Sequence, residues 1–377
     1  MKKCNIKPQI VVGVYLYQNP PIRMQKKIVQ ILLLPLSLLY GGIISLRDMF
    51  YETGLLKSST FNLPVISVGN LSIGGAGKSP HIEYLVRLLN PYLQVGILSR
   101  GYKRETTGFR LVQPFDTAKT VGDEPLQFKK KFGDVVVAVD ENRALGIPMM
   151  VGQYPGLQTI LLDDAFQHRQ VKPGLQILLT PYSDLFTRDF LLPSGRLREW
   201  RSAYKRADII IVTKCPDEVS PEDRKKIIEE IRPQKHQEVY FSRFAYDYPY
   251  HFYDPRYRIR LDDDLDVLLV SAIANTSYLT QYLDKMVKKI HAAEYEDHHT
   301  FTQQDIDYMI QKFKNLDAKR KFILTTEKDA TRLEPFKQYL YDHQIPVFVQ
   351  PTNVMFLDDD KKAFDKKVKD YLLGFRY

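Results

Sequence analysis

The chain has 377 residues, of which 44% are hydrophobic and 12% aromatic, which is enough for a sizeable core and for two lobes. Its formal net charge of +9 favours an anionic partner, and because no dense basic run is interleaved with aromatics, a nucleic acid is not expected. Two distant cysteines, Cys4 and Cys215, indicate neither a disulfide framework nor a cysteine metal site, and they are compatible with a reducing cytosol.

The first predicted element is an apolar helix near the N-terminus. Residues 28–46 carry no charge and are rich in leucine, although Pro35 and Gly41-Gly42 interrupt the run. The run is just long enough to span a bilayer, and no small-residue cleavage site indicates a removed signal peptide. A membrane-associated helix over about 26–50 is the favoured interpretation, and a buried core helix is the alternative.

A glycine-rich loop between a strand and a helix is the next predicted feature. Residues 64–68 are an apolar strand pattern, and helical spacing follows from Tyr84. Such a loop wraps backbone N–H groups around phosphate oxygens. We expect Lys78 to reach the β- and γ-phosphates of ATP and the Ser79 hydroxyl to bind Mg²⁺. The expected nucleotide-binding residues are Ser72, Ile73, Gly74, Gly75, Ala76, Gly77, Lys78 and Ser79.

This loop departs from the strict P-loop pattern at one position, because Ser72 stands where the first glycine belongs. A glycine-rich turn that happens to precede a lysine is the alternative.

The position of this loop also limits how the N-terminal helix can lie in a membrane. A spanning helix with its basic flank in the cytoplasm would place the loop outside, away from ATP. We therefore expect the helix to dip into or lie along the inner leaflet.

A second apolar strand pattern, residues 159–162, ends in Asp163-Asp164. P-loop folds place a carboxylate near Mg²⁺ at the carboxyl end of a buried strand, so the pair is expected on the metal side. A strand followed by a polar turn is the alternative. Further strands are predicted at 94–98, 134–139, 175–180 and 208–213, and a helix at 220–231.

Strands alternating with helical segments predict an α/β fold: a P-loop NTPase-like parallel sheet with helices on both faces. Tyrosine, arginine and proline crowd together between Pro233 and Asp266, where we expect the connection between lobes. Strands at 267–273, 322–326 and 347–350, with a helix through Tyr282 and Val287, predict a smaller C-terminal α/β lobe. The expected division is an N-terminal segment 1–60, a P-loop domain 61–235 and the C-terminal lobe 236–377. Residues 1–23 show little organisation, and a true start at Met24 stays open.

Several polar clusters can be interpreted either as solvated surface turns or as parts of a functional site. Gly122-Asp123-Glu124-Pro125 is a turn by composition. Asp297-His298-His299 could be metal ligands, a general acid/base set or surface residues without a function. Because no further Cys/His cluster accompanies the pair of histidines, the sequence favours a metal site least. Arginines within 195–200 suit phosphate recognition or a charged surface turn.

Taken in order, these motifs resemble the tetraacyldisaccharide 4′-kinases, the lipid A 4′-kinases of Gram-negative bacteria. The resemblance extends from about Leu32 to beyond Asp329. Ala165 departs from it, since the family usually has glycine there. The motifs are Val68-Gly69-Asn70-Leu71 with the P-loop, Ser99-Arg100-Gly101-Tyr102, Gly122-Asp123-Glu124-Pro125, Asp163-Asp164-Ala165-Phe166-Gln167-His168, Arg196-Leu197-Arg198-Glu199, Asp297-His298-His299 and Thr326-Glu327-Lys328-Asp329.

The resemblance implies ATP- and Mg²⁺-dependent phosphorylation of the 4′-hydroxyl of a lipid disaccharide 1-phosphate. It implies peripheral or monotopic attachment to the cytoplasmic face of the bacterial inner membrane, with no obligate protein partner. By the resemblance, Asp123 is the catalytic base and His298 its partner. The expected catalytic residues are Asp123, His298, Lys78, Asp163 and Asp164. The implied metal-side acids are Asp163, Asp164 and Glu199. The implied substrate contacts are Arg100, Tyr102, Arg143, Gln167, His168 and Arg198.

Two rival functions stay open from the sequence. One is a membrane-associated P-loop switch ATPase of the partitioning type. Such ATPases have a lysine just before the paired glycines, where this chain has Ile73. The other is a nucleotide-binding scaffold without catalysis, which leaves Asp123 and His298 without a role.

Overall fold

The computed structural model describes residues 20–376, with side chains from residue 29 onward. The strands in this range are β1 (Val65–Asn70), β2 (Val95–Ser99), β3 (Arg110–Leu111), β4 (Val136–Val139), β5 (Thr159–Asp163), β6 (Leu175–Pro181), β7 (Ile209–Thr213), β8 (Glu238–Tyr246), β9 (Tyr250–His251), β10 (Asp266–Ser271), β11 (Lys289–Glu294), β12 (Lys321–Thr326), β13 (Val347–Gln350) and β14 (Thr352–Phe356).

The helices in the same range are α1 (Pro20–Glu52), α2 (Lys78–Leu89), α3 (Ala118–Val121), α4 (Asp123–Lys131), α5 (Arg143–Gln153), α6 (Pro221–Ile231), α7 (Ser277–Leu283), α8 (Gln303–Lys314), α9 (Glu327–Leu333), α10 (Lys337–Asp342) and α11 (Asp360–Leu373). Short 3₁₀ helices lie at Phe186–Arg188, Arg201–Arg206 and Glu334–Phe336.

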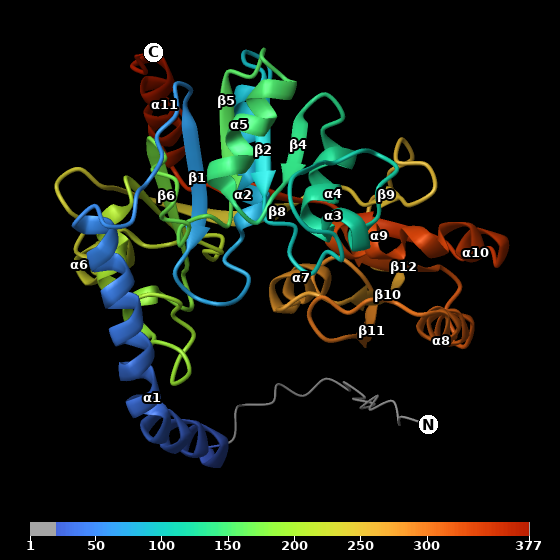
Figure 1. The fold of residues 1–377 in the computed structure, drawn as a ribbon. Helices are drawn as coiled ribbons and strands as arrows, with labels where there is room; N and C mark the ends of the chain where they lie inside the picture. Colours follow the sequence, from blue (N-terminus) through green and yellow to red (C-terminus); the bar gives the residue numbers. More distant parts are fainter. Residues whose placement is uncertain (1–19, 377) are drawn as a thin grey trace.

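The described strands form two sheets (Figure 1). The larger has the order β14-β8-β7-β6-β1-β5-β2-β4-β3, and the smaller has the order β11-β10-β12-β13-β9. We call the two units the larger lobe and the smaller lobe. The inner strands of the larger sheet pair in parallel, and every residue of β1, β2, β5 and β7 is buried. Continuous apolar runs are typical of parallel strands covered on both faces.

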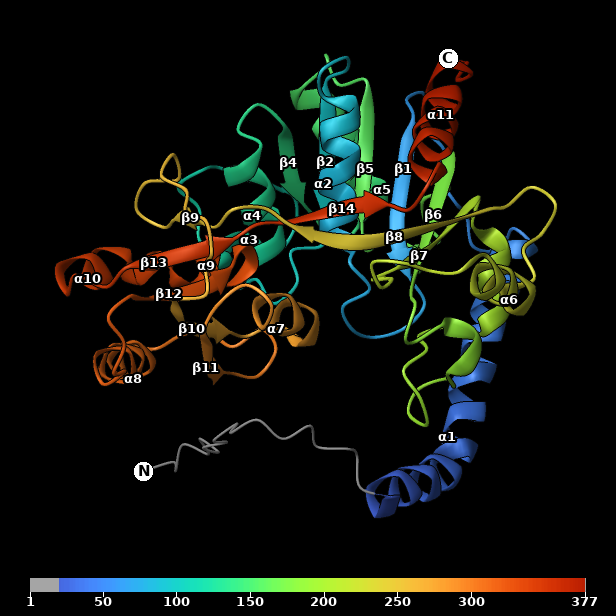
Figure 2. The same ribbon diagram turned by 180° about the vertical axis from the view of Figure 1, so that it is seen from behind.

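Helices provide that cover. The helix α5 lies in front of the sheet in Figure 1, and α2 lies in front of it in the reverse view of Figure 2. Because β1, β2 and β5 are parallel, their carboxyl ends meet at one edge of the sheet, where ligands bind in open α/β sheets. That edge faces the smaller lobe (Figure 1).

Each strand named from the sequence coincides with a strand of the structure, with ends that differ by a few residues at most. The helix predicted at 220–231 is α6, and its first residue follows Ser220, whose hydroxyl accepts from the Asp223 amide. The helix expected to pass Val287 ends earlier, at Leu283. The predicted P-loop-type α/β architecture with a smaller C-terminal α/β lobe is confirmed.

The division expected at 235/236 does not follow sheet membership. The strand β8 belongs to the larger sheet, and β14 returns from the smaller lobe to pair antiparallel with it. Val354 and Phe356 of β14, with Phe364 of α11, pack into the larger core. The chain therefore crosses between the lobes twice, after β8 and at Pro351 (Figure 2). Gln350 Nε2 donates to the Asp247 carbonyl at 2.6 Å and ties the two crossings together.

The helix α1 leans away from the larger lobe and contacts it on one side only (Figure 1). Within the described residues, 29–52 is the one helix long and apolar enough to cross a membrane, and little of it is buried. Ser37 Oγ donates to the Leu191 carbonyl, and a side chain on Gly41 would clash with Trp200. The alternative of a buried core helix is therefore wrong. The interpretation of residues 1–23 falls mostly outside the described residues.

Candidate active site

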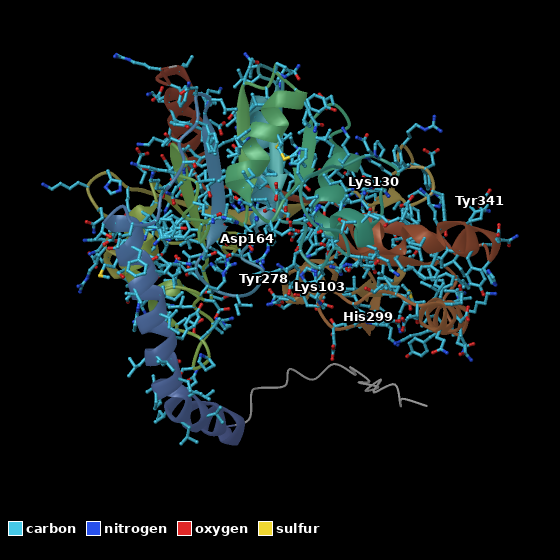
Figure 3. All side chains as sticks on the ribbon, in the orientation of Figure 1. Lys103, Lys130, Asp164, Tyr278, His299 and Tyr341 are labelled. Atoms are coloured by element: carbon cyan, nitrogen blue, oxygen red, sulfur yellow. The ribbon has the colours of Figure 1, made fainter. Side chains whose placement is uncertain are left out.

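A cavity of about 510 Å³ lies where the carboxyl edge of the larger sheet meets the smaller lobe. Figure 3 places Asp164 of the larger lobe and Tyr278 of the smaller lobe at this junction, and both line the cavity. The whole predicted phosphate-binding loop, from Ser72 to Ser79, is part of its wall. A larger cavity of about 1080 Å³ between the lobes is lined by no residue of this loop, so the smaller one is the candidate site.

Backbone geometry explains the glycine that ends the loop. Gly77 has φ +90° and precedes the first residue of α2. An added Cβ would also lie 3.2 Å from the Phe244 ring, so glycine suits the position twice over. The other end of the loop is held by the Ile73 amide, which donates to the Arg196 carbonyl at 2.7 Å. The loop is thus fixed at both ends with the α2 N-terminus behind it, as phosphate binding requires.

The loop lysine and the strand-end acids lie together. Lys78 Nζ is 3.1 Å from Asn70 Oδ1 and 3.6 Å from Asp164 Oδ1. Arg198 donates to both carboxylate oxygens of Asp164, at 2.9 and 3.2 Å. Burial works to raise the pKa of Asp164, but Lys78 and Arg198 outweigh it and hold that pKa below its usual range. Asp164 is therefore ionised and already paired with two cations.

Asp163 is in the opposite electrostatic state. Its Oδ2 accepts from Ser99 Oγ at 3.0 Å, whereas its buried Oδ1 has no hydrogen-bond partner. Burial, together with the negative charges of Glu124 and Asp164, raises the pKa of Asp163 to about 7. A buried carboxylate oxygen without a partner is costly. A cation at this end of the strand would relieve that cost.

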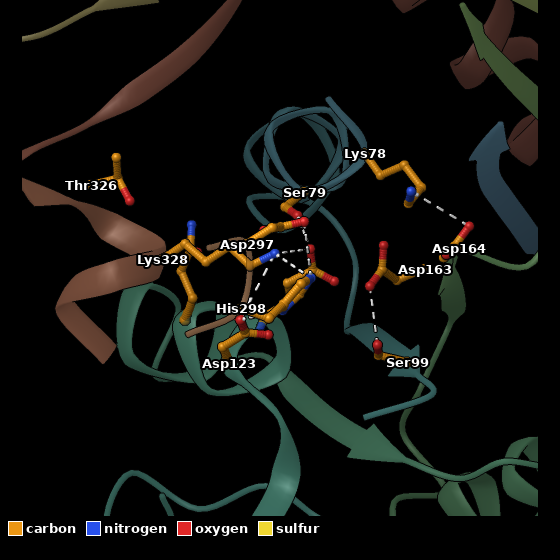
Figure 4. Close-up of polar contacts among 12 residues, drawn as sticks. Lys78, Ser79, Ser99, Asp123, Asp163, Asp164, Asp297, His298, Thr326 and Lys328 are labelled. Atoms are coloured by element: carbon orange, nitrogen blue, oxygen red, sulfur yellow. Dashed lines mark hydrogen bonds and ion pairs between the residues drawn. The ribbon is translucent and has the colours of Figure 1, made fainter. Parts of the chain in front are cut away.

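Asp123 begins α4 and lies among basic side chains of the smaller lobe (Figure 4). Its Oδ2 is 3.2 Å from His298 Nδ1 and 3.8 Å from Lys328 Nζ, and Arg332 donates to the same oxygen. Burial works to raise the pKa of Asp123, but the His298 hydrogen bond, Lys328 and Arg332 hold it below its usual range. The structure thus brings together Asp123 and His298, which are 175 positions apart in the chain.

A close backbone approach positions Asp123 beside the loop that carries Tyr102. Gly122 has φ +92°, and an added Cβ would lie 3.0 Å from Gly101 Cα, so neither loop tolerates a side chain there. Tyr102 consequently lines the cavity, with its ring centroid 5.0 Å from that of His298. His298 has a left-handed backbone, φ +61°. Such conformations in non-glycine residues concentrate at functional sites.

The predicted substrate contacts divide into two groups. Tyr102 and Arg198 line the cavity, whereas Arg100, Arg143, Gln167 and His168 do not. Arg143 is fully buried, and its guanidinium faces the carbonyls of Asp140 and Asp163. It supports the end of β5, so the geometry contradicts direct contact with substrate. Gln167 Nε2 donates to the Asn70 carbonyl at 2.9 Å, and His168 Nε2 lies 2.9 Å from the Glu141 carbonyl.

The structure does not bring Glu199 to the cavity, which corrects its expected place on the metal side. Its carboxylate is fully buried, with one oxygen paired with Arg206 and the other with Arg47 of α1. Glu199 therefore fastens α1 to the larger lobe. The sequence could not show this, because Arg47 lies 152 positions away.

No group of three or more His, Cys, Asp or Glu side chains among residues 29–376 forms a preformed metal cage. Mg²⁺ at nucleotide sites needs none, because phosphates and waters supply most ligands. Ser79 Oγ, Glu124 Oε1 at 3.2 Å from it and the unpaired Asp163 Oδ1 are oxygen donors beside the loop. The residues present therefore fit Mg-ATP.

Sequence reasoning assigned no role to three charged residues of this site. Glu124 bridges Ser79 Oγ and Lys328 Nζ at 3.2 Å each. Arg332 contacts Asp123 and Asp329, and it is buried. Lys328 lies in a quoted motif, which was the available signal. No sequence pattern pointed to Arg332, because a lone arginine on a short helix usually lies on the surface.

Comparisons with known proteins agree with this geometry. Residues 29–372 match the family described as tetraacyldisaccharide-1-P 4′-kinase, LpxK. The tetraacyldisaccharide 4′-kinase of Bacteroides thetaiotaomicron is 40% identical over 90% of this chain and 92% of its own, and that of Flavobacterium psychrophilum is 43% identical over 90% and 96%.

A solved structure agrees as well. LpxK from Aquifex aeolicus in complex with ATP superposes with a TM-score of 0.70 at 26% identity, covering 91% of this chain and 99% of that one. The chain belongs to the tetraacyldisaccharide-1-P 4′-kinase family.

Proposed function

We propose that the chain transfers the γ-phosphoryl group of ATP to the 4′-hydroxyl of a tetraacyldisaccharide 1-phosphate, with Asp123 accepting the hydroxyl proton. Family membership supports the kinase activity and does not favour a partitioning-type switch ATPase. The observation that supports the assignment of the base is one cavity lined by both the phosphate loop and His298, whose Nδ1 lies 3.2 Å from Asp123 Oδ2. Phosphoryl transfer depends mainly on such positioning and on charge stabilisation.

Each charged group has a defined task in this proposal. Lys78 and the loop amides hold the phosphates, and Arg198 keeps Asp164 ionised beside them. Asp123 is ionised at neutral pH because of its neighbours, so its oxygen is free of a proton of its own, and the same neighbours make it a weaker base. Mg²⁺, held by Ser79 and a neighbouring carboxylate, would supply charge neutralisation at the phosphates. His298 orients Asp123 through the 3.2 Å contact.

The reaction itself is the sharpest test of this function. Purified protein would be given γ-³²P-labelled Mg-ATP and the lipid disaccharide 1-phosphate, and products separated by thin-layer chromatography. We expect label in a lipid bisphosphate, and none when the label is on the α-phosphate. Hydrolysis of ATP at equal rates with lipid vesicles that lack the disaccharide, and no labelled lipid, would instead favour the switch ATPase.

We infer further that α1 attaches the chain to the cytoplasmic leaflet, as a peripheral or monotopic protein, with no obligate protein partner. One face of α1 contacts the larger lobe through Ser37 and Gly41. The opposite, exposed face is lined by large apolar side chains, which supports the attachment. Examples on that face are Leu32, Leu39 and Leu46.

Flotation with anionic vesicles tests the attachment. Replacing these three leucines with glutamine should shift the protein to the soluble fraction. Replacing three exposed apolar residues elsewhere, Tyr92, Phe115 and Tyr341, should not. Equal flotation of the two variants would refute the attachment through α1.

A further inference from the structure

The smaller lobe contributes to the site a cation, Lys328, to which the proposed reaction has given no role. Lys328 is the second residue of α9 and lines the cavity. Its Nζ lies 3.2 Å from Glu124 Oε1 and 3.8 Å from Asp123 Oδ2. The same Glu124 oxygen is 3.2 Å from Ser79 Oγ. Lys328 thus connects the proposed base to the proposed Mg²⁺-binding hydroxyl (Figure 4).

We propose that Lys328 is a catalytic residue whose ammonium group contacts the γ-phosphoryl oxygens during transfer. The inference rests on the proposed function and deepens it. Lys328 lines the cavity of the phosphate loop and its Nζ lies 3.8 Å from Asp123 Oδ2, so a phosphoryl group that passes from the loop to a hydroxyl at Asp123 passes close to it. Its charge is spread over three equatorial oxygens at that moment, and a cation already in place stabilises that charge without reorganisation.

The step balances without a further reactant. A bond forms between the 4′-oxygen of the sugar and the γ-phosphorus, and the bond from that phosphorus to the β–γ bridging oxygen breaks. The hydroxyl proton passes to Asp123, and ADP keeps the electron pair of the broken bond. Lys328 keeps its proton throughout. Although burial works to lower the pKa of Lys328, Glu124 and Asp123 raise it above the usual value, which keeps the ammonium charged.

A second lysine between the lobes makes it possible to distinguish a catalytic role of Lys328 from a role in holding the lobes together. Lys130 also joins α4 to the smaller lobe, through Glu334 at 3.3 Å. It faces the larger cavity and has no part in the phosphate-loop cavity. Lys328 differs because it contacts two carboxylates and lies 3.4 Å from His298 Nε2. Lys130→Ala is therefore a matched control for the loss of a lysine between the lobes.

The test compares the full-length protein with Lys328→Ala, Lys328→Arg and Lys130→Ala, after thermal melts have shown that each variant is folded. We expect Lys328→Ala to lower kcat by on the order of 10²-fold, with the KM for ATP changed less than about 3-fold. Lys328→Arg should recover part of the rate, because it keeps the charge. Lys130→Ala should stay within about 2-fold of the parent.

Binding supplies a readout that does not depend on turnover. Affinities for Mg-ADP and for Mg-ADP with aluminium fluoride, which mimics the transferring phosphoryl group, would be measured by calorimetry with acceptor lipid present. Lys328→Ala should weaken binding of the mimic by roughly 10²-fold and leave Mg-ADP binding almost unchanged. Equal weakening of both ligands, or no more effect than Lys130→Ala, would overturn the inference. A parent protein that makes no lipid bisphosphate would overturn the proposed function instead.

Discussion

Both lobes bring acids and bases to one cavity, but around the proposed base the carboxylates of the larger lobe contact basic side chains of the smaller lobe. The larger lobe contributes the carboxylates, at strand ends and at the start of α4: Asp123, Glu124, Asp163 and Asp164. The smaller lobe contributes the basic side chains that contact them: the His298 imidazole and the cations Lys328 and Arg332. The proposed phosphate-binding loop and the acids beside it therefore belong to one lobe, whereas the surroundings of the proposed base depend on the other lobe.

This difference predicts which substitutions affect nucleotide binding and which affect phosphoryl transfer. A change in the phosphate loop should affect nucleotide binding, whereas a change at Asp123 or in the smaller-lobe residues that contact it should affect transfer more than binding. The contacts between the lobes are also of two kinds. Arg332 and Asp123 are both buried, whereas Lys130 and Glu334 are partly exposed to solvent.

The largest effect should come from Asp123, where the two lobes meet. Asp123→Asn removes the proton acceptor but keeps the shape, and we expect kcat to fall by about 10³-fold. Steady-state kinetics at saturating ATP and lipid measure it, with the exposed Asp134→Asn as the control. Turnover close to that of the control would show that another group accepts the proton.

Removing the buried cation should come next. Arg332→Met leaves Asp123 and Asp329 short of a partner, and we expect a loss of roughly 3–5 kcal/mol in the free energy of unfolding, measured with urea. Because Arg332 helps to hold the pKa of Asp123 down, the acid limb of the kcat/KM profile should move to higher pH. Arg332→Lys should lose less stability. A loss below about 1 kcal/mol for Arg332→Met would contradict a buried, structurally required pair.

The stability of the larger lobe should depend on pH through one buried residue, His81, whose two hydrogen-bond partners both belong to that lobe. His81 packs under the phosphate loop, with Nδ1 2.7 Å from the Gly77 carbonyl and Nε2 3.1 Å from Ser242 Oγ. Burial lowers the pKa of His81 to about 4 from its ordinary 6.5. Between these values the unfolded chain binds a proton that the folded chain does not. Stability should therefore fall as pH falls through that window, by at most about 3 kcal/mol.

Denaturant unfolding at several pH values from 4 to 7 measures this effect, and His81→Gln should flatten the part that His81 contributes. The same variant should leave the contacts between the lobes unchanged. An identical pH dependence in the parent and in His81→Gln would show that this histidine is not the group responsible.

The smallest effect should come from the exposed contact between the lobes. Lys130→Ala removes the pair with Glu334, whose side chains are 28% and 39% exposed, respectively. We expect less than about 1 kcal/mol of stability to be lost, because solvent screens such pairs. Urea unfolding of the single and double variants at the two positions gives the coupling energy. A coupling as large as the loss in Arg332→Met would remove the distinction between buried and exposed contacts.

Much of the larger lobe could be predicted because its inner strands are uniform apolar runs followed by glycine or acidic residues. That pattern is sufficient for β1, the loop after it and the Asp163-Asp164 pair. The place of β14 could not be predicted, because it is a half-exposed edge strand that pairs antiparallel with β8. Short strands of this kind carry no signal that says which sheet they join.

The site was predictable where the motifs name it and not where partners come from distant segments. Asp123 and His298 belong to quoted motifs, and the structure brings them together. Glu199 also belongs to a motif, but its partners are Arg47 and Arg206, so its neighbours in sequence gave the wrong location. Arg332 required the lobes to be placed against each other before its contact with Asp123 was visible.

The most direct test of a site shared between the lobes is a double-mutant cycle between Asp123→Asn and His298→Gln, measured as kcat. If the two side chains act as one unit across the lobes, the double variant should be no slower than the slower single variant. If the two losses multiply, the side chains act independently, and the account of one site built from both lobes is contradicted.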